Sequence, residues 1–272
     1  MENAQLISGR LQPGTVSAVA ANVLIFDDQL ILETARRKLG GSTLPGIFFR
    51  QLWTENWLRL KKRVNFRKSE NEDARAAYRQ MNVREFEDIN ARQQWANWRT
   101  IPRNLSGCLP SVAVTAIDLC CGIGHSTEVL AHYLPEGSSV LGLEFNASFV
   151  ERALARTFLH ASGKKAAVSF RAQSVLESFR DAQDRLVPAR SVDLVNCCGA
   201  VGCHFDATAT GRLAAEIARV LRPGGIALID SGAPGTSSDE LERIFGRLGF
   251  RKTSTAKSCF LDLYTQVRLV KL

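Results

Sequence analysis

The sequence predicts an α/β protein with a doubly wound, seven-stranded, mostly parallel sheet, preceded by a helical N-terminal extension. From Val112 onward, short apolar runs alternate with helical stretches, which is the pattern of βαβ units. The runs are apolar almost throughout, as in strands that are buried on both faces. The last two runs are joined by a short link, so we expect them to pair antiparallel.

The individual strands and helices follow from these apolar runs and from the stretches between them. The expected strands are Val112–Leu119, Val140–Leu143, Val168–Phe170, Val192–Val195, Ile226–Asp230, Phe250–Thr253 and Phe260–Lys271. The expected helices between them are Ser126–Tyr133, Ala147–His160, Ala209–Leu221 and Ser238–Leu248.

Residues 1–105 have a different pattern, which favours helices. Asp28–Leu39 ends in a basic turn that Gly40-Gly41 follows, a typical C-terminal signal. A second helix is expected at Ile47–Val64 and a third at Asn82–Trp98, with Asn82 as its N-cap. Pro102 is expected to end this third helix, because a residue before proline avoids the helical conformation.

All four tryptophans lie in this N-terminal part. Trp53 and Trp57 are four residues apart and Trp95 and Trp98 three apart, so each pair shares one helix face. The pairs either anchor the helices on the main domain or line an aromatic acceptor pocket.

Length and composition are those of a globular protein with one α/β domain and an appendage, since the chain has 272 residues, 45% hydrophobic and 23% charged. The first residues lack the basic-then-apolar order of a secretory signal. The apolar stretch Val16–Phe26 is shorter than the ~20 residues that span a bilayer. We therefore expect a cytoplasmic protein with no membrane partner.

The net charge of +8 is concentrated near the N-terminus. Residues 1–110 contain 17 Lys and Arg against 11 Asp and Glu, whereas residues 111–272 contain 18 against 16. A basic N-terminal part is able to attract an anionic partner such as nucleic acid, or it is a solvated helical surface.

The turn after the first expected strand carries the strongest functional signal. Residues 116–127 read AIDLCCGIGHST, a buried strand, a turn with Gly122 and Gly124, and the start of a helix. Such a turn lets a ligand approach the backbone and the free N–H groups of the helix. Thr127 stands where a dinucleotide fingerprint has its third glycine, and His125 where a phosphate loop has lysine.

Two carboxylates complete this expected site. Glu144 ends the second strand, 20 residues after Gly124, where an acid accepts hydrogen bonds from ribose hydroxyls. Asp118 ends the first strand and is able to receive an ammonium group, directly or through water. An acid for a ribose and an acid for an ammonium group suit S-adenosylmethionine.

Because of the glycine turn and the two carboxylates, the segment 111–272 resembles the class I S-adenosylmethionine-dependent methyltransferases. The turn at 118–124 is similar to that family's Asp-Leu-Gly-Cys-Gly-x-Gly motif, with Cys120 at the first glycine. Arg222-Pro223-Gly224-Gly225 resembles the turn before the family's fifth strand, and the final antiparallel pair resembles its reversed sixth and seventh strands. The resemblance implies a Rossmann-like methyltransferase fold and S-adenosylmethionine as cofactor.

The resemblance also implies which residues bind the cofactor. The family often has an acid after the third strand for the adenine, and Gln173 and Ser174 stand there instead. The full expected cofactor set is Asp118, Cys120, Gly122, Gly124, Glu144, Phe145, Gln173, Ser174, Asn196 and Cys197.

Catalytic candidates are expected after the fourth strand, where the sequence reads Asn-Cys-Cys-Gly from Asn196. This differs from the Asn/Asp-Pro-Pro-Tyr/Phe of family members that methylate amino groups of bases or glutamines. His204 is the expected general base, because imidazole titrates near neutral pH, and His125 is the second candidate. Arg99 and Arg103 either contact an anionic group of acceptor or cofactor or are surface charges at a helix end.

The seven cysteines are an odd number in a long chain, so we expect thiols and no disulfide framework. Five of them, Cys120, Cys121, Cys197, Cys198 and Cys203, follow two strands that should lie side by side. No pair has the Cys-x-x-Cys spacing of zinc sites, so no metal is expected.

The sequence therefore predicts a cap or lid at residues 1–105 and an S-adenosylmethionine-binding methyltransferase domain at 106–272. The expected function is methyl transfer to a small-molecule acceptor. An RNA methyltransferase that uses the basic N-terminal part, and a noncatalytic protein that binds the cofactor, are the alternatives. An aminopropyl transferase would need more acids after the fourth strand.

Overall fold

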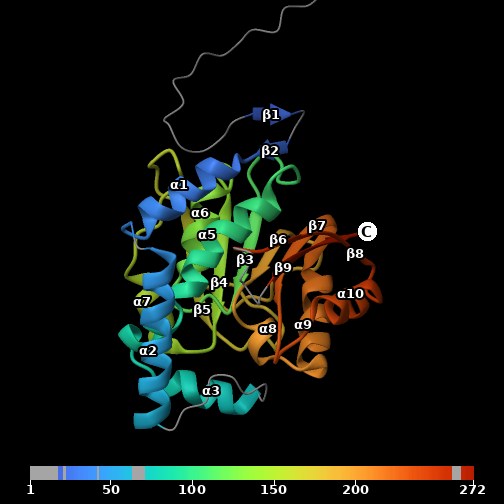
Figure 1. The fold of residues 1–272 in the computed structure, drawn as a ribbon. Helices are drawn as coiled ribbons and strands as arrows, with labels where there is room; N and C mark the ends of the chain where they lie inside the picture. Colours follow the sequence, from blue (N-terminus) through green and yellow to red (C-terminus); the bar gives the residue numbers. More distant parts are fainter. Residues whose placement is uncertain (1–17, 21–22, 42, 63–70, 259–264) are drawn as a thin grey trace, which may run out of the picture.

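The computed structural model describes residues 18–20, 23–41, 43–62, 71–258 and 265–272 (Figure 1). Its main feature is a seven-stranded sheet with strand order β5-β4-β3-β6-β7-β9-β8. The strands are β3 (Thr115–Leu119), β4 (Ser139–Glu144), β5 (Ala167–Ala172), β6 (Val192–Cys197), β7 (Leu221–Ser231), β8 (Phe250–Ala256) and β9 (Thr265–Lys271).

The pairing confirms the predicted fold class. The strands from β5 to β7 are parallel, whereas β9 runs antiparallel to both β7 and β8. All seven strands were expected, with ends that differ by a few residues. Residues 260–264 of the last expected strand lie outside the described residues. The strand order reverses between β3 and β6, and ligands of doubly wound folds bind beside the strand ends at such a point.

Helices cover both faces of the sheet. On one face lie α9 (Ala207–Val220) and α10 (Ser238–Gly246), and their apolar side chains pack on Ile117, Val195 and Ile229. On the other face lie α6 (His125–Tyr133), α5 (Ala91–Leu105) and α1 (Asp28–Lys38), packed on Ala116, Leu194 and Leu228. The two sets alternate along each strand, so a strand that is apolar throughout is buried on both sides.

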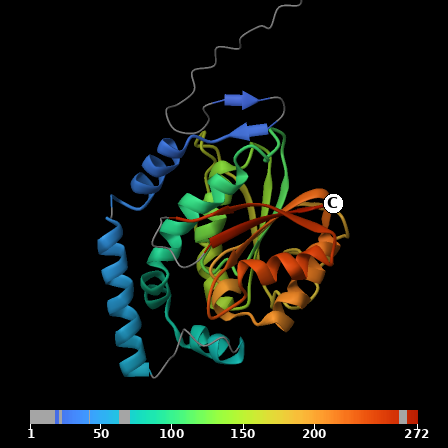
Figure 2. The same cartoon turned by 45° about the vertical axis from the view of Figure 1, so that its right-hand side comes forward.

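The remaining elements are short or lie at the N-terminal side. They are β1 (Ala18–Ala20), β2 (Val23–Ile25), α2 (Leu44–Lys62), α3 (Asn71–Gln80), α4 (Val83–Ile89), α7 (Ala147–Leu154) and α8 (Val201–His204). The hairpin of β1 and β2 and the helix α3 were not expected from the sequence. Figure 2 shows α2 along the outer edge of the molecule, on the side opposite the C-terminal strands.

The third expected helix was wrong in two respects. Asn82 caps α4, and its side chain and that of Glu85 form a capping box, but the helix ends at Ile89 and α5 begins at Ala91. At its other end α5 continues through Pro102 to Leu105. Proline removes one backbone hydrogen bond. We attribute the continuation to the complete burial of Ile101 and Leu105 against the sheet.

Helix α5 is part of the core of the sheet domain. Trp95 and Trp98 are buried in the cluster that also contains sheet residues, so this pair anchors the helix, as one of the two readings proposed. Trp53 and Trp57 lie on α2 with their rings exposed, and neither pair lines the two cavities described below.

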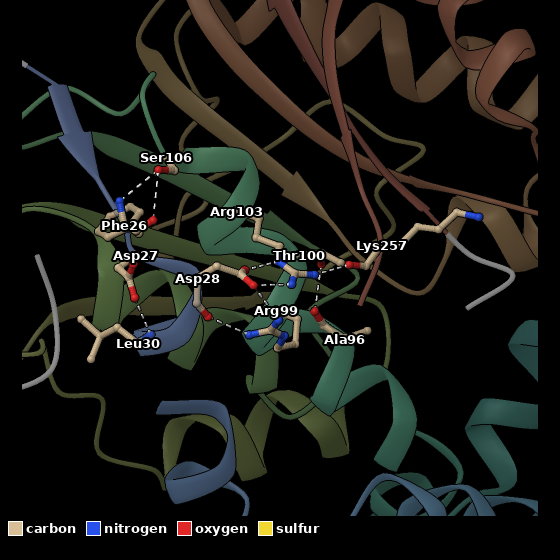
Figure 3. Close-up of polar contacts among 10 residues, drawn as sticks. All are labelled: Phe26, Asp27, Asp28, Leu30, Ala96, Arg99, Thr100, Arg103, Ser106 and Lys257. Atoms are coloured by element: carbon tan, nitrogen blue, oxygen red, sulfur yellow. Dashed lines mark hydrogen bonds and ion pairs between the residues drawn. The ribbon is translucent and has the colours of Figure 1, made fainter. Parts of the chain in front are cut away.

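Arg99 and Arg103 of α5 both bind Asp28 at the start of α1 (Figure 3). Arg103 donates from Nε and Nη2 to the two carboxylate oxygens, at 2.6 and 2.9 Å, and also to the carbonyl of Lys257. Arg99 donates to the carboxylate and to the carbonyl oxygen of Asp28, both at 3.2 Å. The two arginines therefore hold α1 on α5, and neither lines the cavities described below.

This cluster gives a stability prediction. Asp28→Asn should lower the free energy of unfolding at neutral pH by about 1 kcal/mol, since the carboxylate is largely exposed while Arg99 is buried. The hydrogen bond from Arg103 holds the pKa of Asp28 below its ordinary 3.8. The carboxylate therefore stabilises the fold above pH 3.8, and this contribution is lost as the pH falls further.

Urea unfolding of both proteins at several pH values measures the difference. Asp27→Asn is the matched control, because an asparagine still accepts the capping bond from the Leu30 amide. A difference between wild type and Asp28→Asn that is as large at pH 3 as at pH 7 would contradict the role of the ion pair.

Candidate active site

The glycine turn lies at the end of β3, where the strand order reverses. Gly122 and Gly124 have φ angles of 55° and 86°, a backbone conformation that favours glycine. Cys120, at the position of the family's first glycine, also has a positive φ of 53°. A non-glycine residue there stores backbone strain, so the turn accommodates the thiol at a cost of about 1–2 kcal/mol. Gly124 immediately precedes α6 and forms its N-cap.

Glu144 at the end of β4 faces the same place and is buried. Its two carboxylate oxygens accept hydrogen bonds from the backbone amides of Gly122 and Asn146, each at 3.0 Å. Burial raises the pKa of Glu144 to about 7, although these amides favour the ionised form. The carboxyl group therefore connects the glycine turn to the second strand and titrates near neutral pH.

Asp118 is also buried, but it does not line the cavity. One carboxylate oxygen accepts hydrogen bonds from the hydroxyls of Ser126 and Thr127, at 2.7 and 2.6 Å, and the other from the amide of Asn196 at 2.7 Å. Burial raises the pKa of Asp118 to about 6, while these three bonds lower it. The carboxylate thus fastens the first turn of α6 to the end of β6, rather than facing a ligand.

The cavity beside the glycine turn is called the first chamber. It is lined by Tyr78, Phe86, Asn90, Gln93, Gln94, Asn97, Cys120, Cys121, His125, Ser126, Glu144, Phe145, Phe149, Ser174, Val175, Cys198, Gly199, Ala200, His204 and Phe205. Four expected cofactor residues are among them, namely Cys120, Glu144, Phe145 and Ser174. The other six, Asp118, Gly122, Gly124, Gln173, Asn196 and Cys197, are not among the lining residues.

The side chains of Gln173 and Asn196, which do not line the chamber, form hydrogen bonds with other protein groups. The amide of Gln173 donates to the carbonyls of Ser174 and Ser178 and accepts from Arg180. Asn196 accepts from the Gln266 amide, which continues the buried network of Asp118 to β9. These contacts shape the strand ends around the chamber.

The N-terminal helices close the first chamber, and their side chains were missed by the sequence reasoning. Phe86 of α4 lies directly against Gly122, where an added Cβ would come within 2.4 Å of its ring. The ring also packs on Phe149, with ring centroids 4.4 Å apart. The predicted cap or lid at residues 1–105 includes this region, but no spacing in the sequence singles out Phe86.

A second chamber adjoins the first and has a more polar lining. It is lined by Gln51, Glu55, Tyr78, Ile89, Asn90, Arg92, Gln93, Ala96, Thr100, Cys198, Gly199, Cys203, His204, Asp230, Ala233, Pro234, Thr265 and Gln266. Six residues line both chambers: Tyr78, Asn90, Gln93, Cys198, Gly199 and His204. The two chambers therefore meet along this shared wall.

His204 and Tyr78 contact each other at this shared wall. The Tyr78 hydroxyl and His204 Nε2 are 3.1 Å apart, and the rings pack edge to face with centroids 5.5 Å apart. Burial raises the pKa of Tyr78 above its ordinary 10, so the phenol keeps its proton at neutral pH.

Asp230 of β7 holds the short helix that carries His204. Its carboxylate accepts hydrogen bonds from the backbone amides of Ala200, Val201 and Gly202, between 2.8 and 3.3 Å. Burial raises the pKa of Asp230 to about 6. A side chain at Gly202 would come within 2.6 Å of the Ser231 carbonyl carbon, so β7 and α8 pack in close contact.

His125 also lines the first chamber, at the start of α6. Burial, together with the nearby charge of Arg156, lowers the pKa of His125 to about 3. The imidazole is therefore neutral at physiological pH and a weak base.

Three of the six described cysteines are buried, and the other three are partly buried. Cys121, Cys197 and Cys198 are buried, and the pKa of each thiol is raised, for Cys121 and Cys198 mainly by burial and for Cys197 mainly by a hydrogen bond with Cys120. Such thiols are poor nucleophiles at neutral pH. Within the described part of the chain, no group of three or more His, Cys, Asp and Glu is placed to hold a metal ion.

None of the described helices is both long and apolar enough to cross a membrane.

Comparison with known proteins finds a methyltransferase domain. The model of a family described as "Methyltransferase domain" matches residues 116–225, from the glycine-turn strand to the turn within β7. No curated protein matches the sequence significantly.

Solved structures show the same fold. Magnesium protoporphyrin IX methyltransferase from Synechocystis PCC 6803, with bound SAH, superposes with a TM-score of 0.50 and 15% identity, covering 82% of this chain and 100% of that one. A second solved structure is the complex between the Haloferax volcanii Trm112 methyltransferase activator and a methyltransferase. One chain of this complex superposes with a TM-score of 0.51 and 18% identity, covering 70% of this chain and 97% of that one. The family model and these structures therefore show a methyltransferase domain at residues 116–225, with S-adenosylmethionine as its cofactor.

Proposed function

We propose that this enzyme methylates a small polar molecule bound in the second chamber. The observation that carries the proposal is the shared wall of the two chambers, where Tyr78 and His204 lie. A cofactor in the first chamber and an acceptor in the second would meet at this wall. The polar side chains of Gln51, Gln93 and Thr100 suit an acceptor with several hydrogen-bonding groups.

The side chains around the first chamber fit the cofactor. Glu144 is the proposed acceptor for the ribose hydroxyls, because its carboxylate is buried and faces the chamber. Ser174 and Phe145 line the side next to β4 and β5 and are proposed to contact the adenine. Asp118 is proposed as a positioning residue, since its carboxylate is used by Ser126, Thr127 and Asn196.

S-adenosylmethionine supplies the methyl group on a sulfonium, which is already an activated leaving group. The protein then has to align the acceptor atom and remove its proton where it carries one. His204 is the proposed general base, and Tyr78 orients the imidazole through the 3.1 Å contact. Asp230 positions the imidazole by holding α8 through its backbone amides. The low pKa of His125 makes its imidazole a weak base.

The lid is proposed to consist of residues 44–89, that is α2, α3 and α4. They supply Phe86 and Tyr78 to the first chamber and Gln51 and Glu55 to the second. Helix α5 shares a buried cluster with the sheet, so we place the limit between lid and methyltransferase domain near residue 90 rather than at 105.

Transfer of a labelled methyl group tests the proposal. The protein is incubated with S-adenosylmethionine labelled in its methyl group and with a cell extract separated into small-molecule, RNA and protein fractions. We expect label in the small-molecule fraction, because the second chamber is bounded by protein on the side of α2 and α5. If the label is instead released by ribonuclease and the activity falls steeply as the salt concentration is raised, the protein is an RNA methyltransferase.

A further inference from the structure

The outer face of α2 is an exposed apolar surface. Six of the exposed large apolar side chains lie on this one helix, among them Phe49, Leu52, Trp53, Trp57 and Leu60, which are 70%, 53%, 67%, 48% and 81% exposed. Every exposed phenylalanine and tryptophan in the described ranges is on α2. Elsewhere such residues are single, like Val112 and Leu186, which is normal for a protein surface.

The spacing places the five side chains on one side of the helix. With 3.6 residues per turn, Phe49, Leu52, Trp53, Trp57 and Leu60 fall within less than half of its circumference. The opposite side carries Ile47 and Leu58, which are buried. Helix α2 is therefore apolar on both sides, although only its inner side packs on α4 and α5.

Basic side chains border the exposed stripe. On the helical circumference, Arg59 lies at one edge and Lys61 at the other, and both are exposed. The Lys61 ammonium lies over the Trp57 ring, 4.2 Å from its centroid. Residues 44–68 contain seven Lys and Arg and a single acid, Glu55, which faces the second chamber. The stripe thus combines aromatic and leucine side chains with positive charge and lacks an acid.

We propose that this face of α2 docks on an anionic membrane surface. A helix that lies in the membrane interface inserts tryptophan, phenylalanine and leucine among the acyl chains while its basic edges contact anionic headgroups. Leucine and phenylalanine at the centre of the stripe favour lipid over RNA, whose backbone offers them only phosphates. A second copy of the chain would bring basic edges together without an acid to pair them. The absence of a membrane partner expected from the sequence concerned spanning segments, which surface docking does not require.

The docking face and the second chamber lie on opposite sides of the same helix. Gln51 and Glu55 line the chamber, and the Gln51 amide oxygen accepts a hydrogen bond from the Arg92 backbone at the start of α5. Docking through Trp53 and Leu60 would therefore hold the acceptor chamber next to the lipid surface. Figures 1 and 2 both show α2 at the edge of the molecule, with one side turned away from the sheet.

Sedimentation with vesicles tests the proposal on the full chain. We expect the wild type to sediment with vesicles of phosphatidylcholine and phosphatidylglycerol, and to bind pure phosphatidylcholine at least about tenfold more weakly. Trp53→Ser with Leu60→Ser should weaken binding at least about tenfold, as should Arg59→Gln with Lys61→Gln. Val112→Ser with Leu186→Ser removes two exposed apolar side chains elsewhere and should leave binding unchanged.

Binding of S-adenosylmethionine and thermal unfolding confirm that each variant is folded. Failure of the wild type to sediment with anionic vesicles would overturn the proposal. So would self-association in solution that Trp53→Ser with Leu60→Ser abolishes, because the stripe would then bind a second copy. Binding of RNA that the same variant abolishes, without binding of vesicles, would likewise overturn it.

Discussion

Glu144→Ala should weaken the binding of S-adenosylmethionine at least about tenfold, or about 1.4 kcal/mol. The carboxylate is the buried acid that faces the first chamber, and we propose that it accepts the ribose hydroxyls. Its loss also leaves the Gly122 amide without the acceptor at 3.0 Å that holds the glycine turn. Titration calorimetry of wild type and variant measures the difference, with Glu151→Gln, a change of an exposed side chain on α7, as the control.

The same residue predicts a pH dependence of binding. Burial raises the pKa of Glu144 from 4.5 to about 7, so the fold favours the protonated acid, a contribution to stability that is lost as the pH rises through 7. Ribose hydroxyls donate to the ionised form. Binding should therefore weaken as the pH falls below 7, by about tenfold at pH 6.

Glu144→Gln is the matched variant for this effect. The amide oxygen still accepts hydrogen bonds but does not titrate, so its weaker binding should not change with pH through Glu144. Ionisation of the cofactor itself is common to both proteins and cancels in the comparison. Equal pH profiles for wild type and Glu144→Gln would show that Glu144 does not bind the ribose in its ionised form.

The sheet could be predicted because each strand is an apolar run of its own. Residues that alternate along β3, such as Ala116 and Ile117, pack into clusters on opposite faces, and such a strand is apolar at most of its positions. Where a local rule and tertiary packing disagreed, packing prevailed. Pro102 lies inside α5, because Ile101 and Leu105 are buried against the sheet.

The candidate site could be predicted only in part. Glu144 and the glycine turn lie in one stretch and its neighbouring strand, so their spacing was informative. Sequence spacing does not distinguish a side chain that lines a chamber from one behind it, and Asp118 proved to bind Ser126, Thr127 and Asn196. Phe86 and Tyr78 reach the chambers from helices far away in the sequence, which no local pattern reveals.

His204→Gln should lower kcat by about 10²–10⁴-fold while leaving the dissociation constant of S-adenosylmethionine within about twofold of the wild-type value. This follows from the proposal that the imidazole takes a proton from the acceptor at the wall between the chambers. Glutamine fills similar space and forms hydrogen bonds but accepts no proton near neutral pH. The assay is transfer of the labelled methyl group to the purified small-molecule fraction.

Tyr78→Phe separates the base from its positioning partner. It removes the hydroxyl 3.1 Å from His204 Nε2 but keeps the ring that packs on Phe86 and His204, so a smaller loss of kcat is expected. The pH profile of kcat should lose its acidic limb in His204→Gln and keep it in Tyr78→Phe, because only the first change removes the group that is proposed to take the proton. If His204→Gln lowers kcat without altering the profile, the imidazole only positions the acceptor. A histidine that merely packs against Tyr78 would leave both kcat and its pH dependence close to wild type.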